Sequence, residues 1–405
     1  MNKSILKKVG LMITGVLVLL LLLIVQPWSK YPVLNMFSAF DPETRAENFR
    51  NMENLLPHVL LTSSTSPYQY PVDISPVSLT YDFEGEVKSV ADFLSRTESS
   101  SLLVIKDGTI VHEEYLNGAN ALSLHTSWSV AKSFISTLVG IARDEGLIES
   151  VEDKVSKYLP DLEGTAYGDA RIKHVLQMSS GVDFTESYGA TGANTALAIS
   201  SVQILLNKAW VFGIDPDMQL SGFGKFEEPG KRFYYRSVDT HLLSTLVRGV
   251  YNQPLEDILQ EKLWQPLGMT SDANWSTAAG VPIGFCCLNA VSRDYAKLGS
   301  LYLNNGNWNG FEIVSSDWVT EATIPSEQHV QPEAIGGHRG YQYQWWVPKG
   351  YDGEFFANGI WGQAIWVSRK NNMVIVRTAT DPRFRENTPE MIAVMRALSS
   401  LDYNP

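Results

Sequence analysis

The sequence predicts an α/β fold of the α+β type, in which one antiparallel sheet is flanked by helices and completed by both ends of the chain. Three observations support this fold class. Residues 101–115 form two strand-like runs around Asp107-Gly108, a dipeptide typical of a tight hairpin. From Ser129 onward, apolar residues recur at threes and fours, as they do in a helix. Residues 341–379 alternate strand-like runs with turns.

The N-terminal segment predicts a single membrane anchor. Three lysines precede an uncharged run of 17 residues, Val9–Val25, which is at the short end of what crosses a bilayer. A cleaved signal peptide is the first alternative and a buried helix the second, but no small-residue cleavage site follows the run. The lysines are expected on the cytoplasmic side, which places the body on the periplasmic or other extracytoplasmic side.

The remaining chain divides into an approach segment and one large body. Residues 1–30 hold the cytoplasmic stub and anchor, and residues 31–84 are a proline- and serine-rich linker and approach segment. Residues 85–405 form the body, with a mostly helical insertion at about 165–280. A closing helix is expected from Pro389 to Leu401. We therefore expect one sheet-based domain interrupted by helices.

Composition excludes several classes of protein. The chain of 405 residues is 44% hydrophobic and 19% charged, which excludes a disordered or collagen-like protein. Its net charge of −12 and the lack of a basic cluster argue against a nucleic-acid partner. Seven scattered histidines show no ligand spacing, so we expect neither a metal nor an organic cofactor. Cys286 and Cys287 are interpreted as buried thiols, with a vicinal disulfide as the alternative.

Ser129-Val130-Ala131-Lys132 is the candidate reaction centre. Residues three apart share a helix face, so the Lys132 amine can reach the Ser129 hydroxyl. The positive helix end and partial burial both disfavour the ammonium form and lower the lysine pKa. A neutral lysine then activates the serine as a nucleophile. The alternative is a serine that caps the helix beside a solvated lysine, and the same spacing at Ser4–Lys7 carries no chemistry.

Three further segments match a known family in order and spacing. Residues 229–238 resemble the Pro-Gly-x-x-Phe-x-Tyr-Ser segment of the serine β-lactamase and penicillin-binding-protein-like hydrolases. Residues 172–181 resemble that family's His-Leu-Leu-x-x-Thr-Ser-Gly helix and turn, and residues 289–299 resemble its Ser-Ala-Arg-Asp segment. The resemblance covers residues 85–400 and implies a β-lactamase/transpeptidase-like fold.

The resemblance also implies roles for individual residues. Ser129 corresponds to the nucleophile, Lys132 to its base, and Tyr235 to the tyrosine that relays a proton to the leaving group. The oxyanion hole would consist of the backbone N–H groups of Ser129 and Ile360. The residues expected to contact substrate are Ser237, Tyr188, Gly359 and Trp361. A core aromatic is the alternative for Tyr235, and core packing is the alternative for Tyr188 and Trp361.

Within the family the chain looks closest to the class C-like esterases and the 6-aminohexanoate-dimer hydrolases. Ala357 stands where β-lactamases carry a cation that meets a substrate carboxylate. We therefore expect a membrane-anchored serine hydrolase that cleaves a small ester or amide through a Ser129 acyl-enzyme. A D-alanyl carboxypeptidase or β-lactamase acting on cell-wall-type substrates is the alternative enzyme. A non-catalytic peptide-binding relative is the alternative from another class.

Overall fold

The computed structural model describes residues 3–26, 29–32, 38–75, 79–186 and 201–403. In this part of the chain the main sheet has seven strands, paired antiparallel throughout. Their order across the sheet is β12 (Arg339–Gln342), β13 (Trp345–Pro348), β14 (Glu354–Gly359), β15 (Gln363–Ser368), β16 (Met373–Ala379), β4 (Ser99–Lys106) and β5 (Thr109–Tyr115). Strands from both ends of the chain therefore complete one sheet, as predicted.

The hairpin predicted at Asp107-Gly108 is confirmed. Strand β4 pairs antiparallel with β5, and both turn residues have positive φ, +49° and +76°. Two successive positive φ values match the right-handed twist of the flanking strands, which is why Asp-Gly favours this turn.

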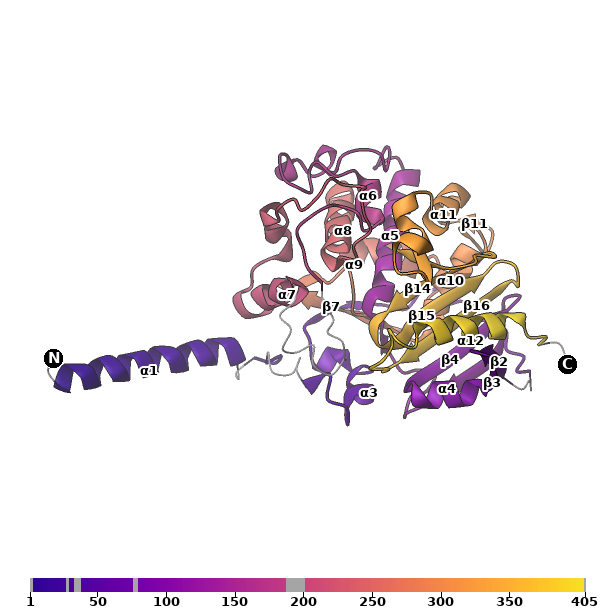
Figure 1. The fold of residues 1–405 in the computed structure, drawn as a ribbon, viewed down its shortest axis with the longest axis horizontal. Coiled ribbons are helices and arrows are strands. Elements are labelled where there is room, and N and C mark those ends of the chain that lie inside the picture. The colour runs from indigo at the N-terminus through magenta and orange to yellow at the C-terminus, as the bar shows by residue number, and fades with distance from the viewer. Residues whose placement is uncertain (1–2, 27–28, 33–37, 76–78, 187–200, 404–405) are drawn as a thin grey trace.

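The two faces of the sheet are covered by different helices (Figure 1). Because side chains alternate along a strand, Val374 and Val376 of β16 pack on one face and Met373 and Ile375 on the other. The first face carries α5 (Ala131–Asp144) and α10 (Ser292–Leu303), and the second carries α4 (Val90–Arg96) and α12 (Thr388–Ser400). Burial on both faces explains why these strands read as continuous apolar runs.

A second sheet and a helical region complete the body. The strands of this second sheet are, in order across it, β1 (His58–Leu61), β7 (Ala273–Ala278), β9 (Leu288–Ala290) and β6 (His125–Thr126), and β8 (Val281–Pro282) pairs with β7. In chain order, the helical region follows β5 and precedes β12. Its helices are α6 (Ile172–Leu176), α7 (Ser201–Phe212), α8 (Ser237–Tyr251) and α9 (Leu255–Leu259). Smaller elements are α3 (Arg45–Asn48), α11 (Ser316–Thr323), and the strand pairs β2 (Thr80–Phe83) with β3 (Glu86–Ser89) and β10 (Asn307–Trp308) with β11 (Phe311–Glu312).

The segment predicted as a linker, residues 31–84, contributes to the body. Strand β1 pairs with β7, and Phe49, Met52 and Leu56 pack in a small apolar cluster with Trp361. The pairing matters for the site, because β7 and β9 belong to the sheet on which the Ser129 turn rests.

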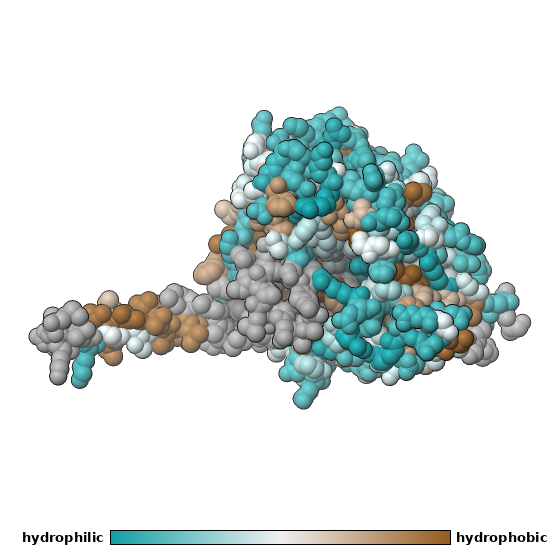
Figure 2. All heavy atoms as spheres, viewed as in Figure 1, coloured by the Kyte–Doolittle hydropathy of each residue, from teal (hydrophilic) through white to brown (hydrophobic). Residues whose placement is uncertain are grey.

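The predicted membrane anchor is wrong. The N-terminal helix α1 (Lys3–Val25) projects from the body in Figure 1, with apolar side chains on the surface visible in Figure 2. Yet no helix in the described part of the chain is both long enough and apolar enough to cross a membrane. A spanning helix needs about 20 predominantly apolar residues. Lysines occupy the first turns of α1 and leave a shorter uncharged run. The anchor, the membrane partner and the localisation derived from them are therefore not supported.

Candidate active site

Ser129 lies in a tight turn that joins the second sheet to helix α5. The turn is a 3₁₀ helix, Trp128–Val130, which follows β6 and runs directly into α5. Trp128 has a φ of +43°, a backbone conformation that costs about 1–3 kcal/mol and is often held at functional sites. Ser127 anchors the turn to β9, because its N–H donates to the Leu288 carbonyl at 2.8 Å and its Oγ accepts from the Leu288 N–H at 3.1 Å. Ser129 keeps 8% of its surface exposed.

Lys132 lies three residues after Ser129, at the beginning of α5, and its side chain is buried. Its Nζ donates to Ser237 Oγ at 3.0 Å and to the Phe285 carbonyl at 2.9 Å. Among the hydrogen bonds of the described residues, none joins Lys132 to Ser129. Burial lowers the Lys132 pKa to about 7, against the opposing charges of Glu186 and Asp239. The lowered pKa agrees with the expectation from the sequence, and it makes the neutral amine accessible near pH 7.

Ser237 and Glu186 extend this network away from the nucleophile. Ser237 begins helix α8, and its Oγ donates to Glu186 Oε1 at 2.8 Å. The Ser237 backbone N–H also donates to Glu186 Oε2. Burial raises the Glu186 pKa, while Lys132 and the two Ser237 hydrogen bonds oppose that rise. A chain of two hydrogen bonds therefore links the Lys132 amine through the Ser237 hydroxyl to the Glu186 carboxyl group.

Tyr235 stands beside the same pair. Its ring centroid lies 5.2 Å from Lys132 Nζ, and its ring stacks on Trp346 of β13 at 5.7 Å. Burial and the neighbouring Tyr341 and Glu186 raise the Tyr235 pKa well above its usual value, while a side-chain hydrogen bond with Ser129 lowers it. Tyr235 therefore remains a protonated phenol near neutral pH, within hydrogen-bonding reach of the candidate nucleophile.

The end of strand β14 approaches the Ser129 turn from the other side. A Cβ on Gly359 would lie 2.6 Å from the Ser127 carbonyl oxygen and 3.1 Å from Trp128 Cβ, so only glycine permits this contact. Ile360 follows in a short turn, which Gln363 holds by donating to the Ala379 carbonyl at 2.5 Å and the Trp361 carbonyl at 3.3 Å. The structure thus brings Gly359 and Ile360 to the backbone that carries Ser129.

The remaining two predicted substrate contacts have different positions. Trp361 is 3% exposed and packs against Phe40 and Phe49, with the Arg45 guanidinium 4.6 Å from its ring. The approach segment therefore covers it. Tyr188 lies outside the described residues.

The two cysteines form a vicinal disulfide, the alternative that the sequence left open. Cys286 directly follows Phe285, whose carbonyl accepts from Lys132. Cys287 has a φ of +68°, and the Cys286 carbonyl accepts from Trp275 Nε1 at 2.9 Å. The disulfide thus fixes the chain beside one of the two acceptors of Lys132.

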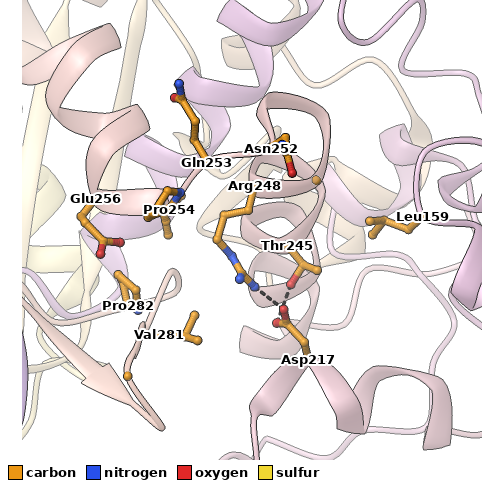
Figure 3. A pocket seen from close by; sticks show the side chains of 13 residues that line it. Leu159, Asp217, Thr245, Arg248, Asn252, Gln253, Pro254, Glu256, Val281 and Pro282 are labelled. Carbon is orange, nitrogen blue, oxygen red and sulfur yellow. Dashed lines mark hydrogen bonds and ion pairs between the residues drawn. The ribbon is translucent and has the colours of Figure 1, made fainter.

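A separate surface cavity of about 580 Å³ lies between α8, α9 and the β7–β8 turn. Figure 3 shows Asp217 in this cavity, bound by both Arg248 and Thr245. None of the predicted catalytic residues lines the cavity, so it is separate from the candidate reaction centre at Ser129.

Sequence reasoning missed two charged residues of the site, Glu186 and Arg339. Glu186 occurs in a loop with no periodicity, and it meets Ser237 across 51 positions of sequence. Arg339 begins β12, and its guanidinium carbon lies 3.7 Å from the ring centroid of Trp346. Glu186 follows the matched segment 172–181 by five residues, and Arg339 lies beside none of the matched segments, so no specific local signal marked either residue.

Comparisons with known proteins show the family to which the chain belongs. The family model described as Beta-lactamase matches residues 88–398. The chain is 26% identical over 303 residues to the 6-aminohexanoate-dimer hydrolase of Paenarthrobacter ureafaciens, covering 71% of this chain and 74% of that protein.

Two solved structures establish the fold. A putative 6-aminohexanoate-dimer hydrolase from Bacillus anthracis has a TM-score of 0.79 at 21% identity, covering 92% of this chain and 97% of that one. A family VIII carboxylesterase has a TM-score of 0.57 at 18% identity, covering 76% and 95%. The predicted β-lactamase/transpeptidase-like fold is confirmed. Because the family model spans most of the sequence, the chain belongs to the beta-lactamase family and is a serine hydrolase of that family.

Proposed function

We propose that the protein hydrolyses small esters or amides through an acyl-enzyme on Ser129, with Lys132 as the base and Tyr235 as the proton relay. The observation that carries this proposal is the buried Lys132, one helical turn from Ser129, with its pKa lowered to about 7. A base of that pKa is matched to proton transfer near neutral pH. A solvated lysine, the alternative interpretation, would not be buried.

The proposed acylation step begins when Ser129 Oγ attacks the substrate carbonyl carbon. Its proton passes to neutral Lys132, and the carbonyl oxygen becomes an oxyanion held by the N–H groups of Ser129 and Ile360. Each such donor is worth about 3 kcal/mol of transition-state stabilisation. Tyr235 then protonates the leaving alcohol or amine as its bond to the carbonyl carbon breaks, and it recovers a proton from Lys132.

Deacylation repeats the sequence with water. Water adds to the acyl carbonyl and gives a proton to the Lys132–Tyr235 pair, and that pair returns a proton to Ser129 Oγ as the carboxylic acid leaves. No oxidant, reductant or additional reactant is needed. The similarity to a 6-aminohexanoate-dimer hydrolase and to a family VIII carboxylesterase supports amides and esters as candidate substrates of this chain.

Covalent labelling tests the proposed nucleophile. The full chain is exposed to a fluorophosphonate, in which a serine oxygen displaces fluoride, and its intact mass is recorded. We expect one adduct on the wild type and none on Ser129→Ala. Ser136→Ala is the matched control, because it removes a buried hydroxyl from helix α5, which directly follows the Ser129 turn, and is expected to keep the adduct.

The same experiment separates the proposal from a non-catalytic protein. Absence of an adduct on folded wild type, or an adduct that survives in Ser129→Ala, overturns the assignment of Ser129. If an adduct is found, a panel of matched esters and amides then assigns the preferred bond.

A further inference from the structure

We propose that Phe40 is a positioning residue that holds the two halves of the proposed oxyanion hole in register. This inference rests on the proposed function, because it takes the N–H groups of Ser129 and Ile360 as the donors that hold the oxyanion. It gives a catalytic purpose to the approach segment, which the sequence presented as a linker.

Each proposed donor adjoins a tryptophan with an unusual backbone conformation. Trp128 directly precedes Ser129 and has a φ of +43°, and Trp361 directly follows Ile360 and has a φ of +63°. A left-handed conformation is unfavourable for so bulky a residue, so it persists only where the surrounding structure holds it. The Ser129 N–H belongs to the peptide group that joins it to Trp128, so the backbone angles of Trp128 set its direction. The contacts that hold these tryptophans therefore also hold the proposed donors.

One ring of the approach segment contacts both tryptophans face to face. The Phe40 ring stacks on Trp128 with the centroids 5.8 Å apart and on Trp361 with the centroids 5.9 Å apart, at interplanar angles of 26° and 22°. Phe49 meets the same two rings edge-on, at 5.1 and 5.7 Å. Among the ring pairs of the described residues, none joins Trp128 directly to Trp361. The two indoles are therefore linked through the phenylalanine rings.

Two further contacts attach this part of the approach segment to the body. The Phe49 carbonyl accepts from the Thr126 N–H at 3.1 Å, in β6, the strand before the nucleophile turn. On the other side, the Arg45 guanidinium lies 4.6 Å from the Trp361 ring centroid and donates to Glu98 Oε2 at 2.8 Å. The segment is thus attached beside both of the turns that carry the proposed donors.

Loss of the Phe40 ring is expected to act on the oxyanion and not on substrate binding. Acylation and deacylation both pass through a tetrahedral oxyanion, so a displaced donor slows both steps. An uncharged ester in the ground state gains much less from the same donors. A fall in kcat with KM nearly unchanged is the signature of an interaction made only in the transition state.

Kinetics of the full chain with p-nitrophenyl butyrate test the proposal. The nitrophenolate leaves without needing a proton, so the rate reports on the oxyanion. We expect Phe40→Ala to lower kcat by about 10-fold or more, part of the about 100-fold that removal of a whole donor costs. Phe40→Tyr keeps the stacked ring and is expected to keep the wild-type kcat. The rate of fluorophosphonate labelling is a second readout, because phosphonylation also develops charge on an oxygen, and it should fall in parallel.

Phe83→Ala is the matched control. It removes another half-buried phenyl ring of the approach segment, from β2, which packs on α12 and belongs to a different apolar cluster from Phe40. It is expected to keep the wild-type kcat and labelling rate, and thermal unfolding curves show which variants fold. If Phe40→Ala does not fold, Phe40→Leu takes its place, because it keeps most of the volume without the flat ring, and kcat is expected to fall in the same direction.

The outcomes separate this inference from the proposed function. A folded Phe40→Ala or Phe40→Leu protein with wild-type kcat and labelling rate overturns the role of Phe40 while the proposed hydrolase stands. An equal loss in Phe83→Ala overturns it as well, because the effect would then be one of general packing. If folded wild type neither hydrolyses the ester nor forms the adduct, the proposed function fails and this inference fails with it.

Discussion

At the scale of single residues, the site depends on how burial and charge act on Lys132. Burial disfavours its ammonium form, and the opposite charges of Glu186 and Asp239 restore part of it, so the pKa lies near 7 instead of near 10.5. A neutral lysine can accept the Ser129 proton, and a protonated lysine cannot. Activity is therefore expected to rise with pH through the Lys132 pKa.

Replacing Glu186 by glutamine tests its role in setting the Lys132 pKa. Glu186 raises the Lys132 pKa, so Glu186→Gln lowers that pKa further and moves the acidic limb of the kcat/KM profile to lower pH. Glu152→Gln is the control, because Glu152 pairs with Arg171 and Lys173 on the surface. The shift is measured from kcat/KM between about pH 4.5 and 9, in steps of about 0.5 unit. Such steps resolve a change of about one pKa unit. An unchanged limb, or one shifted to higher pH, contradicts this role.

At the scale of elements, catalytic geometry depends on the contact between the end of β14 and the Ser129 turn. Gly359 makes the contact possible, and Gln363 fixes the following turn. The disulfide between Cys286 and Cys287 holds a third segment beside Lys132. Each segment brings one part of the site, so misplacing any one of them separates the nucleophile from its partners.

Gly359→Ala tests this contact. The added methyl would lie 2.6 Å from the Ser127 carbonyl oxygen, so β14 and the Ser129 turn must move apart. We expect kcat/KM to fall by about 100-fold, as misplacement of reacting groups by about 1 Å does. Gly222→Ala is the control, because its Cβ would meet no atom within 4 Å. Steady-state kinetics with a thermal unfolding curve distinguish a displaced site from an unfolded protein, and wild-type kinetics for Gly359→Ala would refute the argument.

At the scale of the whole molecule, distant parts of the chain hold the site together. Ser101 of β4 and Thr378 of β16 share a hydrogen bond across 277 positions of sequence. Beside them the buried Arg377 donates to Ser99 Oγ, Thr97 and the Gly362 carbonyl. The turn after Ile360 is thereby tied to the residues at the start of β4.

Helix α12 is expected to contribute strongly to global stability. Met395 is fully buried between α12 and the sheet, so Met395→Ala should lower the free energy of unfolding by about 2–5 kcal/mol. Leu122→Ala, at a position that is 79% exposed, should change it by less than about 0.5 kcal/mol. Urea denaturation of both variants checks the difference. Equal midpoints would show that α12 is not part of the cooperative core.

The sequence by itself determined the local features of this protein. Asp107-Gly108 specifies a hairpin through its own backbone preferences, and the apolar spacing after Ser129 specifies a buried helix. Ser129 and Lys132 are three residues apart, and residues at that spacing lie on the same face of any helix. The strands at both ends of the chain could be recognised, and with the matched segments they indicated the family. Each of these signals is contained within a few neighbouring residues.

Only the tertiary structure decided how these pieces become a site. The acceptors of Lys132, the carboxylate of Glu186 and the position of Arg339 come from segments far apart in sequence. Trp361 was expected near substrate, and the fold packs it beneath Phe40 and Phe49 instead. Desolvation and charge depend on which distant groups exclude water and how closely they approach, so no local pattern specifies them.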